Sequence, residues 1–159
     1  MNDVAIALAV HVTAIVLWIG GVAMVTTVLL PAVRQFKTAQ DRMAFFAIVE
    51  RRFAWQARGT TLLAGASGLY LVYRLDLWPQ FLTIGYWWLD AMVAVWLLFT
   101  LMLFVAEPLF LDRWFQTQAL QAPEATFALI QRLHWVLLAV GLLTILGAVA
   151  GTQGVSFFD

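Results

Sequence analysis

The sequence predicts an all-α protein, an integral membrane four-helix bundle with both termini outside, and three observations lead to this fold class. The 159 residues are 64% hydrophobic and only 11% charged, with a mean hydropathy of +0.89, whereas soluble domains are about half apolar and a quarter charged. The apolar residues form four runs that are long enough to cross a bilayer. Polar connections separate these runs, and we expect one transmembrane domain over residues 1–159.

The first apolar run, residues 4–30, is stopped by Pro31 and is expected to form the first helix. No basic stretch or small-residue cleavage site begins it, so we expect a retained helix and not a signal peptide. His11 lies in this run, and Trp18 follows seven residues later in a Trp-Ile-Gly-Gly sequence. Seven residues are about two helical turns, so the two rings share a face. Because an ionisable side chain is costly inside a membrane, we expect this face to form a wall of a cofactor pocket.

The other helices follow in order along the chain. In the polar connection 31–54 charges alternate with apolar side chains, which indicates an amphipathic helix that lies at the interface or extends the second helix. Glu107-Pro108 is expected to end the third helix, and a second polar connection then runs to Glu124. The four helices are expected at residues 4–30, 53–73, 84–106 and 126–150.

The basic residues predict the orientation. Six of the nine lie in or beside the connection between the first and second helices, and two lie between the third and fourth or just inside the fourth. Arg74 alone lies on the other side. Cytoplasmic connections carry the excess of lysine and arginine, so we expect both long connections in the cytoplasm and both termini outside.

The two histidines are the candidate metal ligands, and they enter from opposite sides. His11 lies roughly 10 Å into the first helix from the outer side, near the depth of Met92 on the third helix. His134 enters from the cytoplasmic side, so we expect the two imidazoles roughly 10–15 Å apart along the membrane normal. Two separate sites are therefore expected, one at His11 with Met92 and the other at His134.

Three arginines near the cytoplasmic side are expected to pair with carboxylates of a ligand at His134: Arg51, Arg52 and Arg58. Each candidate also has a structural interpretation. A membrane histidine can donate to a carbonyl of a neighbouring helix, a methionine can fill the core, and an arginine can extend to the interface. The lack of cysteine excludes iron–sulfur clusters and thiolate zinc sites. A net charge of zero gives no support to a nucleic-acid partner.

Several segments resemble a known group of membrane proteins. His11, the Leu-Trp-Ile-Gly-Gly sequence at 17–21 and the Leu-Leu-Pro-Ala-Val-Arg sequence at 29–34 resemble the first helix of CopD-like copper-resistance domains and of HemJ-type protoporphyrinogen oxidases. The Val-Glu-Arg-Arg-Phe sequence at 49–53 and the Ser-Gly-Leu-Tyr-Leu sequence at 67–71 resemble the second helix of the HemJ group. The resemblance implies a four-helix haem b protein of the bacterial cytoplasmic (inner) membrane.

The chain also departs from the HemJ pattern. That group begins its third helix with Trp-Leu-His-Ala-Lys, and this lysine is implicated in haem binding and activity. The matching run 88–92 is Trp-Leu-Asp-Ala-Met, so Met92 replaces the lysine. Methionine is an axial haem ligand that raises the reduction potential, and His134 adds a ligand that the HemJ group lacks. Both changes favour electron transfer over porphyrinogen oxidation.

The leading hypothesis is a membrane-bound b-type cytochrome with one or two haems per chain, held by His11 and His134. It would pass electrons to or from a redox protein or a quinone, and a homodimer is expected, in which each chain supplies a ligand. One alternative is a copper-handling CopD-like protein, in which His11 and methionines such as Met24, Met92 or Met102 bind Cu(I). Two others are a HemJ-like oxidoreductase and a structural subunit without a cofactor.

Overall fold

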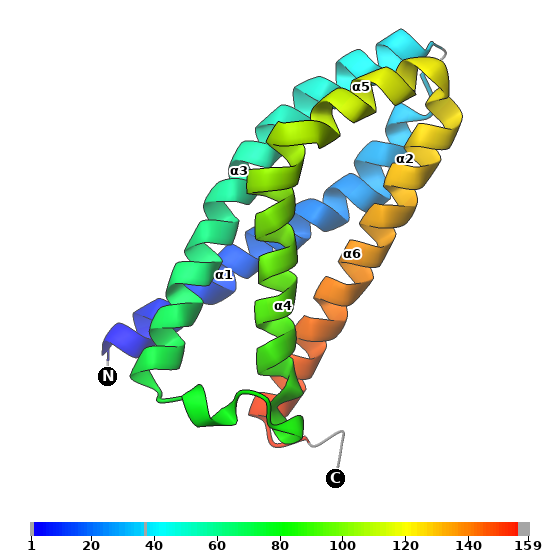
Figure 1. Cartoon of the computed structure of the whole chain (residues 1–159). Helices are drawn as coiled ribbons and strands as arrows, with labels where there is room; N and C mark the ends of the chain where they lie inside the picture. Colours follow the sequence, from blue (N-terminus) through cyan, green and yellow to red (C-terminus); the bar gives the residue numbers. More distant parts are fainter. Residues whose placement is uncertain (1, 37, 156–159) are drawn as a thin grey trace.

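The computed structural model describes residues 2–36 and 38–155, and this part of the chain is helical apart from short loops (Figure 1). In chain order, the elements are α1 (Asn2–Met24), the π-helical turn η1 (Val25–Leu29), α2 (Leu30–Val33), α3 (Ala39–Arg74), the 3₁₀ turns η2 (Trp78–Gln80) and η3 (Ile84–Tyr86), α4 (Trp87–Leu101), the π-helical segment η4 (Met102–Leu111), α5 (Asp112–Gln121) and α6 (Pro123–Thr152).

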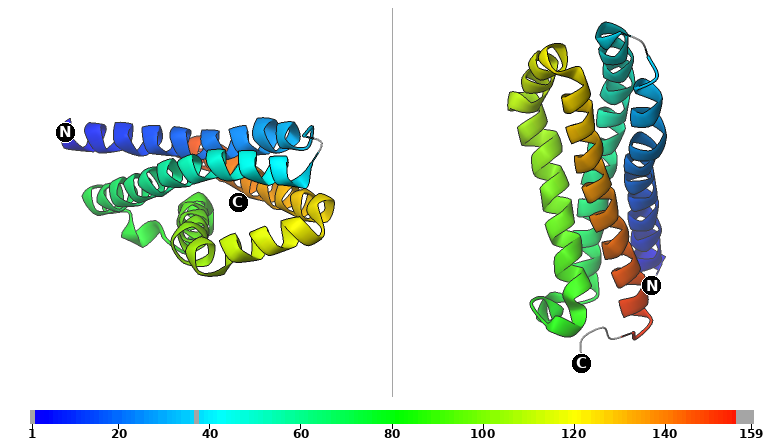
Figure 2. Two further views of the ribbon diagram at one scale, coloured as in Figure 1. Left: turned by 90° about the horizontal axis from the view of Figure 1, so that it is seen from above. Right: turned by 90° about the vertical axis from the view of Figure 1, so that its right-hand side faces the viewer.

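These elements form four long rods, α1–η1–α2, α3, α4–η4–α5 and α6, which lie side by side (Figures 1 and 2). The start of α1, the end of α6 and the loop between α3 and α4 lie at one end of the bundle, and the α2–α3 turn and the α5–α6 corner lie at the other. The predicted all-α fold with four long helices is confirmed. Among the described residues, three rods are long and apolar enough to cross a membrane: Asn2–Val33, Ile84–Leu111 and Pro123–Thr152.

α3 is one continuous helix of 36 residues, so residues 39–54 of the predicted connection extend the second helix. The prediction that Pro31 stops the first helix is wrong, because the first rod continues through Pro31 to Val33. α3 begins after Thr38, which has an extended backbone, and Oγ1 of Thr38 accepts the N–H of Asp41 at 3.1 Å and so caps the first turn. No glycine or proline interrupts residues 39–58, and nothing therefore stops the helix before it reaches its apolar half. The amphipathic half and the more apolar half are thus one continuous rod.

α1 and α3 pack closely because small residues lie between them. Ala14, Ala57 and Ala64 are buried, and a Cβ added at Gly21 would lie 2.2 Å from Cε2 of Phe53. Small residues let helix backbones approach in a membrane, where association relies on van der Waals packing. This close packing brings side chains of α1 directly onto the backbone of α3.

The prediction that the third helix ends at Glu107-Pro108 is wrong, because the chain continues helically through η4 into α5. Pro108 has no N–H to give to the carbonyl of Leu103, which lies five residues earlier, at the π-helical spacing. The Nε–H of Arg58 donates to that carbonyl instead, at 3.1 Å, and its Nη2 lies 2.8 Å from Oε1 of Glu107. The helix bends at this segment and α5 leads across to the start of α6 (Figure 1).

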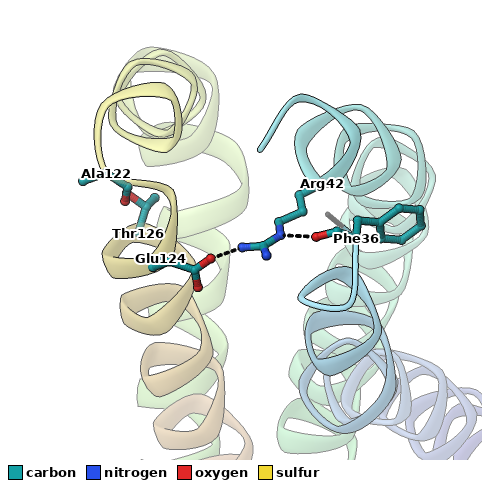
Figure 3. A network of polar contacts seen from close by, with 5 residues as sticks. All are labelled: Phe36, Arg42, Ala122, Glu124 and Thr126. Atoms are coloured by element: carbon teal, nitrogen blue, oxygen red, sulfur yellow. Dashed lines mark hydrogen bonds and ion pairs between the residues drawn. The ribbon is translucent and has the colours of Figure 1, made fainter. Parts of the chain in front are cut away.

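An ion pair closes the end of the bundle that carries the α5–α6 corner. Arg42 near the start of α3 pairs with Glu124 in the first turn of α6, and its Nε–H donates to the carbonyl of Phe36 at 2.8 Å (Figure 3). Beneath this pair, Phe46, Phe115 and Phe127 pack against one another with ring centroids 5.3–5.9 Å apart. The aromatic cluster buries apolar area, while the exposed ion pair contributes little free energy and mainly sets the pairing of the helix ends.

Candidate functional site

His11 on α1 is held by the backbone of α3. Its Nδ1 lies 2.9 Å from the carbonyl oxygen of Ala64 and 3.1 Å from Oγ of Ser67. A carbonyl oxygen can only accept, so Nδ1 carries the hydrogen. Ser67 donates its own hydroxyl to the carbonyl of Leu63, so its oxygen is a second acceptor for the imidazole. Nε2 of His11 therefore keeps its lone pair as a free ligand position.

Gly68 sets the position of the His11 ring. A Cβ at Gly68 would lie 3.0 Å from Cε1 and 3.4 Å from Nδ1 of His11, which is tighter than ordinary contact. The glycine thus lets the Cε1–Nδ1 edge of the half-buried ring approach α3 closely. Sequence analysis did not single out Ser67 or the Ala64 carbonyl, although both lie in a run of small residues, 64–68 (Ala-Gly-Ala-Ser-Gly), of the kind that lets a neighbouring helix approach.

Met92 lies on α4 at about the same height as His11. The register of α3 and α4 is set by Trp96, whose indole N–H donates to the carbonyl of Thr61 at 2.9 Å. The two helices are antiparallel, so Met92, one turn before Trp96, comes level with Gly68 on α3. The shared depth expected from the sequence therefore agrees with the register of the bundle.

Asp90, just before Met92, has a structural role. Its carboxylate accepts the backbone N–H of Leu82 at 3.1 and 3.3 Å. Leu82 adopts a left-handed backbone conformation with φ of 59°, and the carboxylate satisfies its amide there. The side chain ties the α3–α4 loop to the start of α4.

His134 on α6 has the same tautomer as His11 but a different anchor. Its Nδ1 lies 2.9 Å from the carbonyl of Ile130, one turn earlier on the same helix, so Nδ1 is again the donor and Nε2 keeps its lone pair. Gln131, on the same turn, donates to the carbonyl of Thr26 on α1 at 2.7 Å. This contact aligns His134 with the π-helical turn of α1.

The two imidazoles lie at different heights of the bundle. The Gln131–Thr26 contact places His134 about 12 residues along α1 from His11, or roughly 18 Å. One metal ion with two nitrogen ligands needs them about 4 Å apart, at about 2 Å from the metal each. The geometry thus separates the two histidines into two positions, further apart than the 10–15 Å expected.

Trp18 belongs to the core. Its side chain is 4% exposed and meets Phe99 of α4 edge-on, with ring centroids 4.9 Å apart. Among the described residues its indole N–H has no hydrogen-bond partner. The ring is packed two turns from His11 and holds α1 against α4.

The three candidate arginines do not gather at His134. Arg58 is engaged by Glu107 and by the Leu103 carbonyl, as described above. Arg51 and Arg52 are exposed and line a shallow groove on the outer face of α3. In the part of the chain that the structure describes, no cluster of three or more histidine and acidic side chains could hold a metal ion. The candidate metal ligands among the described residues are thus the separate imidazoles of His11 and His134 and the thioether of Met92.

Comparison with protein families, curated proteins and solved structures finds no match to this chain. The resemblance to HemJ and CopD-like proteins therefore stays a prediction, and the functional argument depends on the geometry of the chain itself.

Proposed function

We propose that this protein is a membrane-bound b-type cytochrome in which Nε2 of His11 binds one haem iron and Nε2 of His134 binds another. The observation that carries the proposal is the shared state of the two imidazoles: each donates Nδ1–H to a backbone carbonyl and leaves Nε2 free. A histidine that ligates a metal usually has this second hydrogen bond, because it fixes the ring and the tautomer. A structural histidine that donates to a carbonyl has the same tautomer, so the haem content of the purified protein distinguishes the two roles.

The residues around His11 fit an axial ligand. Gly68 supports the ring with no side chain of its own, Ala64 and Ser67 hold Nδ1, and the thioether of Met92 lies at the same height. A bound haem supplies one-electron redox chemistry, and imidazole and thioether are both ligands that it accepts. The chain orients the imidazole and excludes water with apolar helices.

The proposal includes α3 as a fourth membrane span. Its outer face exposes Trp55 and Tyr73, each to 70%, and 18 residues of helix separate them by about 27 Å. Tryptophan and tyrosine concentrate at membrane interfaces, and the hydrocarbon core is about 30 Å thick. Four spans leave both ends of the chain on one side, and the basic residues favour the outer side of a bacterial cytoplasmic membrane.

The test is an optical spectrum of the full chain purified in detergent. We expect a Soret band with sharp α and β bands on reduction. Haem content should fall by about half in the single variant His11→Ala, and by about half in the single variant His134→Ala. Trp135→Phe, a change next to His134 that leaves both imidazoles in place, is the matched control and should keep full haem content.

Two results would overturn the proposal. A protein that takes up no haem but binds stoichiometric copper would support the copper-handling alternative. Haem content that does not change in the double variant His11→Ala/His134→Ala would show that other residues ligate the iron.

A further inference from the structure

Arg51 and Arg52 lie at the level of a membrane surface. Both precede Trp55 by about one turn, on the side away from Tyr73, and the Trp55–Tyr73 distance matches the thickness of the hydrocarbon core. At the opposite boundary, Arg74 follows Tyr73 directly and pairs with Asp3, whose carboxylate also accepts the Tyr70 hydroxyl at 2.9 Å. α3 thus has an aromatic residue and arginine at each end of its apolar face.

The two arginines differ from the paired arginines of the bundle. Arg42, Arg58 and Arg74 each pair with a carboxylate, whereas the guanidinium groups of Arg51 and Arg52 form no ion pair with any described residue. Two arginines with exposed side chains therefore line the same groove.

The surface around them continues as a groove and an apolar ridge. Ala47 and Ile48 complete the groove with the two arginines, in a cavity of about 240 Å³. Seven-residue spacing places Ile48, Trp55, Leu62 and Leu69 on one face of α3, and all four are exposed. The positively charged end of this surface matches a phosphate headgroup, and the apolar ridge that continues into the membrane matches the acyl chains of a phospholipid.

We propose that this face of α3 binds an anionic phospholipid of the phosphatidylglycerol class. Arg51 and Arg52 bind the phosphate with their planar, multi-donor guanidinium groups, the headgroup occupies the groove on Ala47 and Ile48, and the acyl chains lie along Trp55 and Leu62. Anionic lipids are attracted to arginines next to a membrane span. The proposal rests on α3 as a membrane span, which is part of the proposed function, and it does not depend on haem binding.

The experiment uses the full chain in nonionic detergent and measures bound lipid by native mass spectrometry. Phosphatidylglycerol, phosphatidylcholine with the same acyl chains, and inorganic phosphate are titrated separately. The test variant is Arg51→Gln/Arg52→Gln. The matched control is Arg34→Gln/Arg113→Gln, which removes two exposed arginines from the same end of the bundle. Thermal unfolding in phosphatidylcholine checks that each variant is folded.

We expect the wild-type chain to bind phosphatidylglycerol at least tenfold more tightly than phosphatidylcholine. The test variant should lose this preference, the control should keep it within twofold, and inorganic phosphate at equal concentration should not displace the lipid. Three results overturn the proposal: a test variant that keeps the preference, a control that loses it equally, or displacement by phosphate, which would indicate a site for a soluble anion.

Discussion

At the scale of single residues, the protein is distinguished by where its glycines lie. Gly68 has the His11 ring against it, Gly21 has Phe53, and Gly65 has the indole of Trp96. Gly20 and Gly59 have nothing within 4 Å of an added Cβ. Glycine thus allows close packing at Gly21, Gly65 and Gly68 but not at Gly20 or Gly59. A substitution at one of the first three can therefore be compared with a control at Gly20 or Gly59.

Gly68→Ala should displace the imidazole of His11, because the new methyl group would lie 3.0 Å from Cε1. Under the proposed function we expect the haem content of the purified protein to fall several-fold. Gly59→Ala, on the same helix with open space around it, is the control and should keep its haem. Equal haem contents in the two variants would show that Gly68 does not set the orientation of the ring.

Gly21→Ala and its neighbour Gly20→Ala should change stability in opposite directions. The first places a methyl group 2.2 Å from the Phe53 ring, and overpacking of this kind costs about 1–3 kcal/mol. The second meets no neighbour and gains up to about 1 kcal/mol of helix propensity. Unfolding midpoints in detergent measure both, and a Gly21→Ala protein as stable as wild type contradicts the close α1–α3 packing.

At the scale of elements, the π-helical segment η4 explains how a proline lies inside a continuous rod. Arg58 of α3 supplies the donor that Pro108 lacks, and Glu107 balances its charge. The bend that results carries α5 across to α6 and closes the bundle (Figure 1). Arg58, which sequence analysis assigned to a ligand carboxylate, thus stabilises the neighbouring segment η4.

Arg58→Gln should destabilise the bundle by about 1–3 kcal/mol, since it removes the donor to the Leu103 carbonyl and the ion pair with Glu107. The loss should be smaller in a Pro108→Ala background, because alanine restores the backbone N–H. A double-mutant cycle of unfolding free energies measures this coupling. Strictly additive losses would show that Arg58 and Pro108 act independently.

At the scale of the whole molecule, the decisive feature is that the start of α1, the end of α6 and the α3–α4 loop lie at one end of four rods (Figures 1 and 2). With four spans, the α2–α3 turn and the α3–α4 loop face opposite sides of the membrane. If α3 lay on the surface, they would face the same side. The number of spans can therefore be tested by measuring on which side of the membrane the α2–α3 turn and the α3–α4 loop lie.

The chain contains no cysteine, so single cysteines can be introduced without a background signal. In intact spheroplasts, Thr83→Cys in the α3–α4 loop should react with a membrane-impermeant maleimide. Gln35→Cys in the α2–α3 turn should react only after permeabilisation. Reaction of both at the same rate before permeabilisation would falsify the four-span arrangement.

The sequence alone determined the all-α class and the long apolar helices, because hydrophobic run length is a local property and a bilayer requires it. It also indicated the depth shared by His11 and Met92, since depth follows from counting residues along a helix. Haem binding, the HemJ resemblance and the homodimer stay predictions.

Only the tertiary structure decided what each polar side chain contacts. The Nδ1–H of His11 donates to a carbonyl 53 residues away, and Arg58 donates to one 45 residues away. The helix extends through Pro108 because of that second contact. Such contacts depend on the relative rotation and register of two helices. The sequence pattern of a single helix does not determine either.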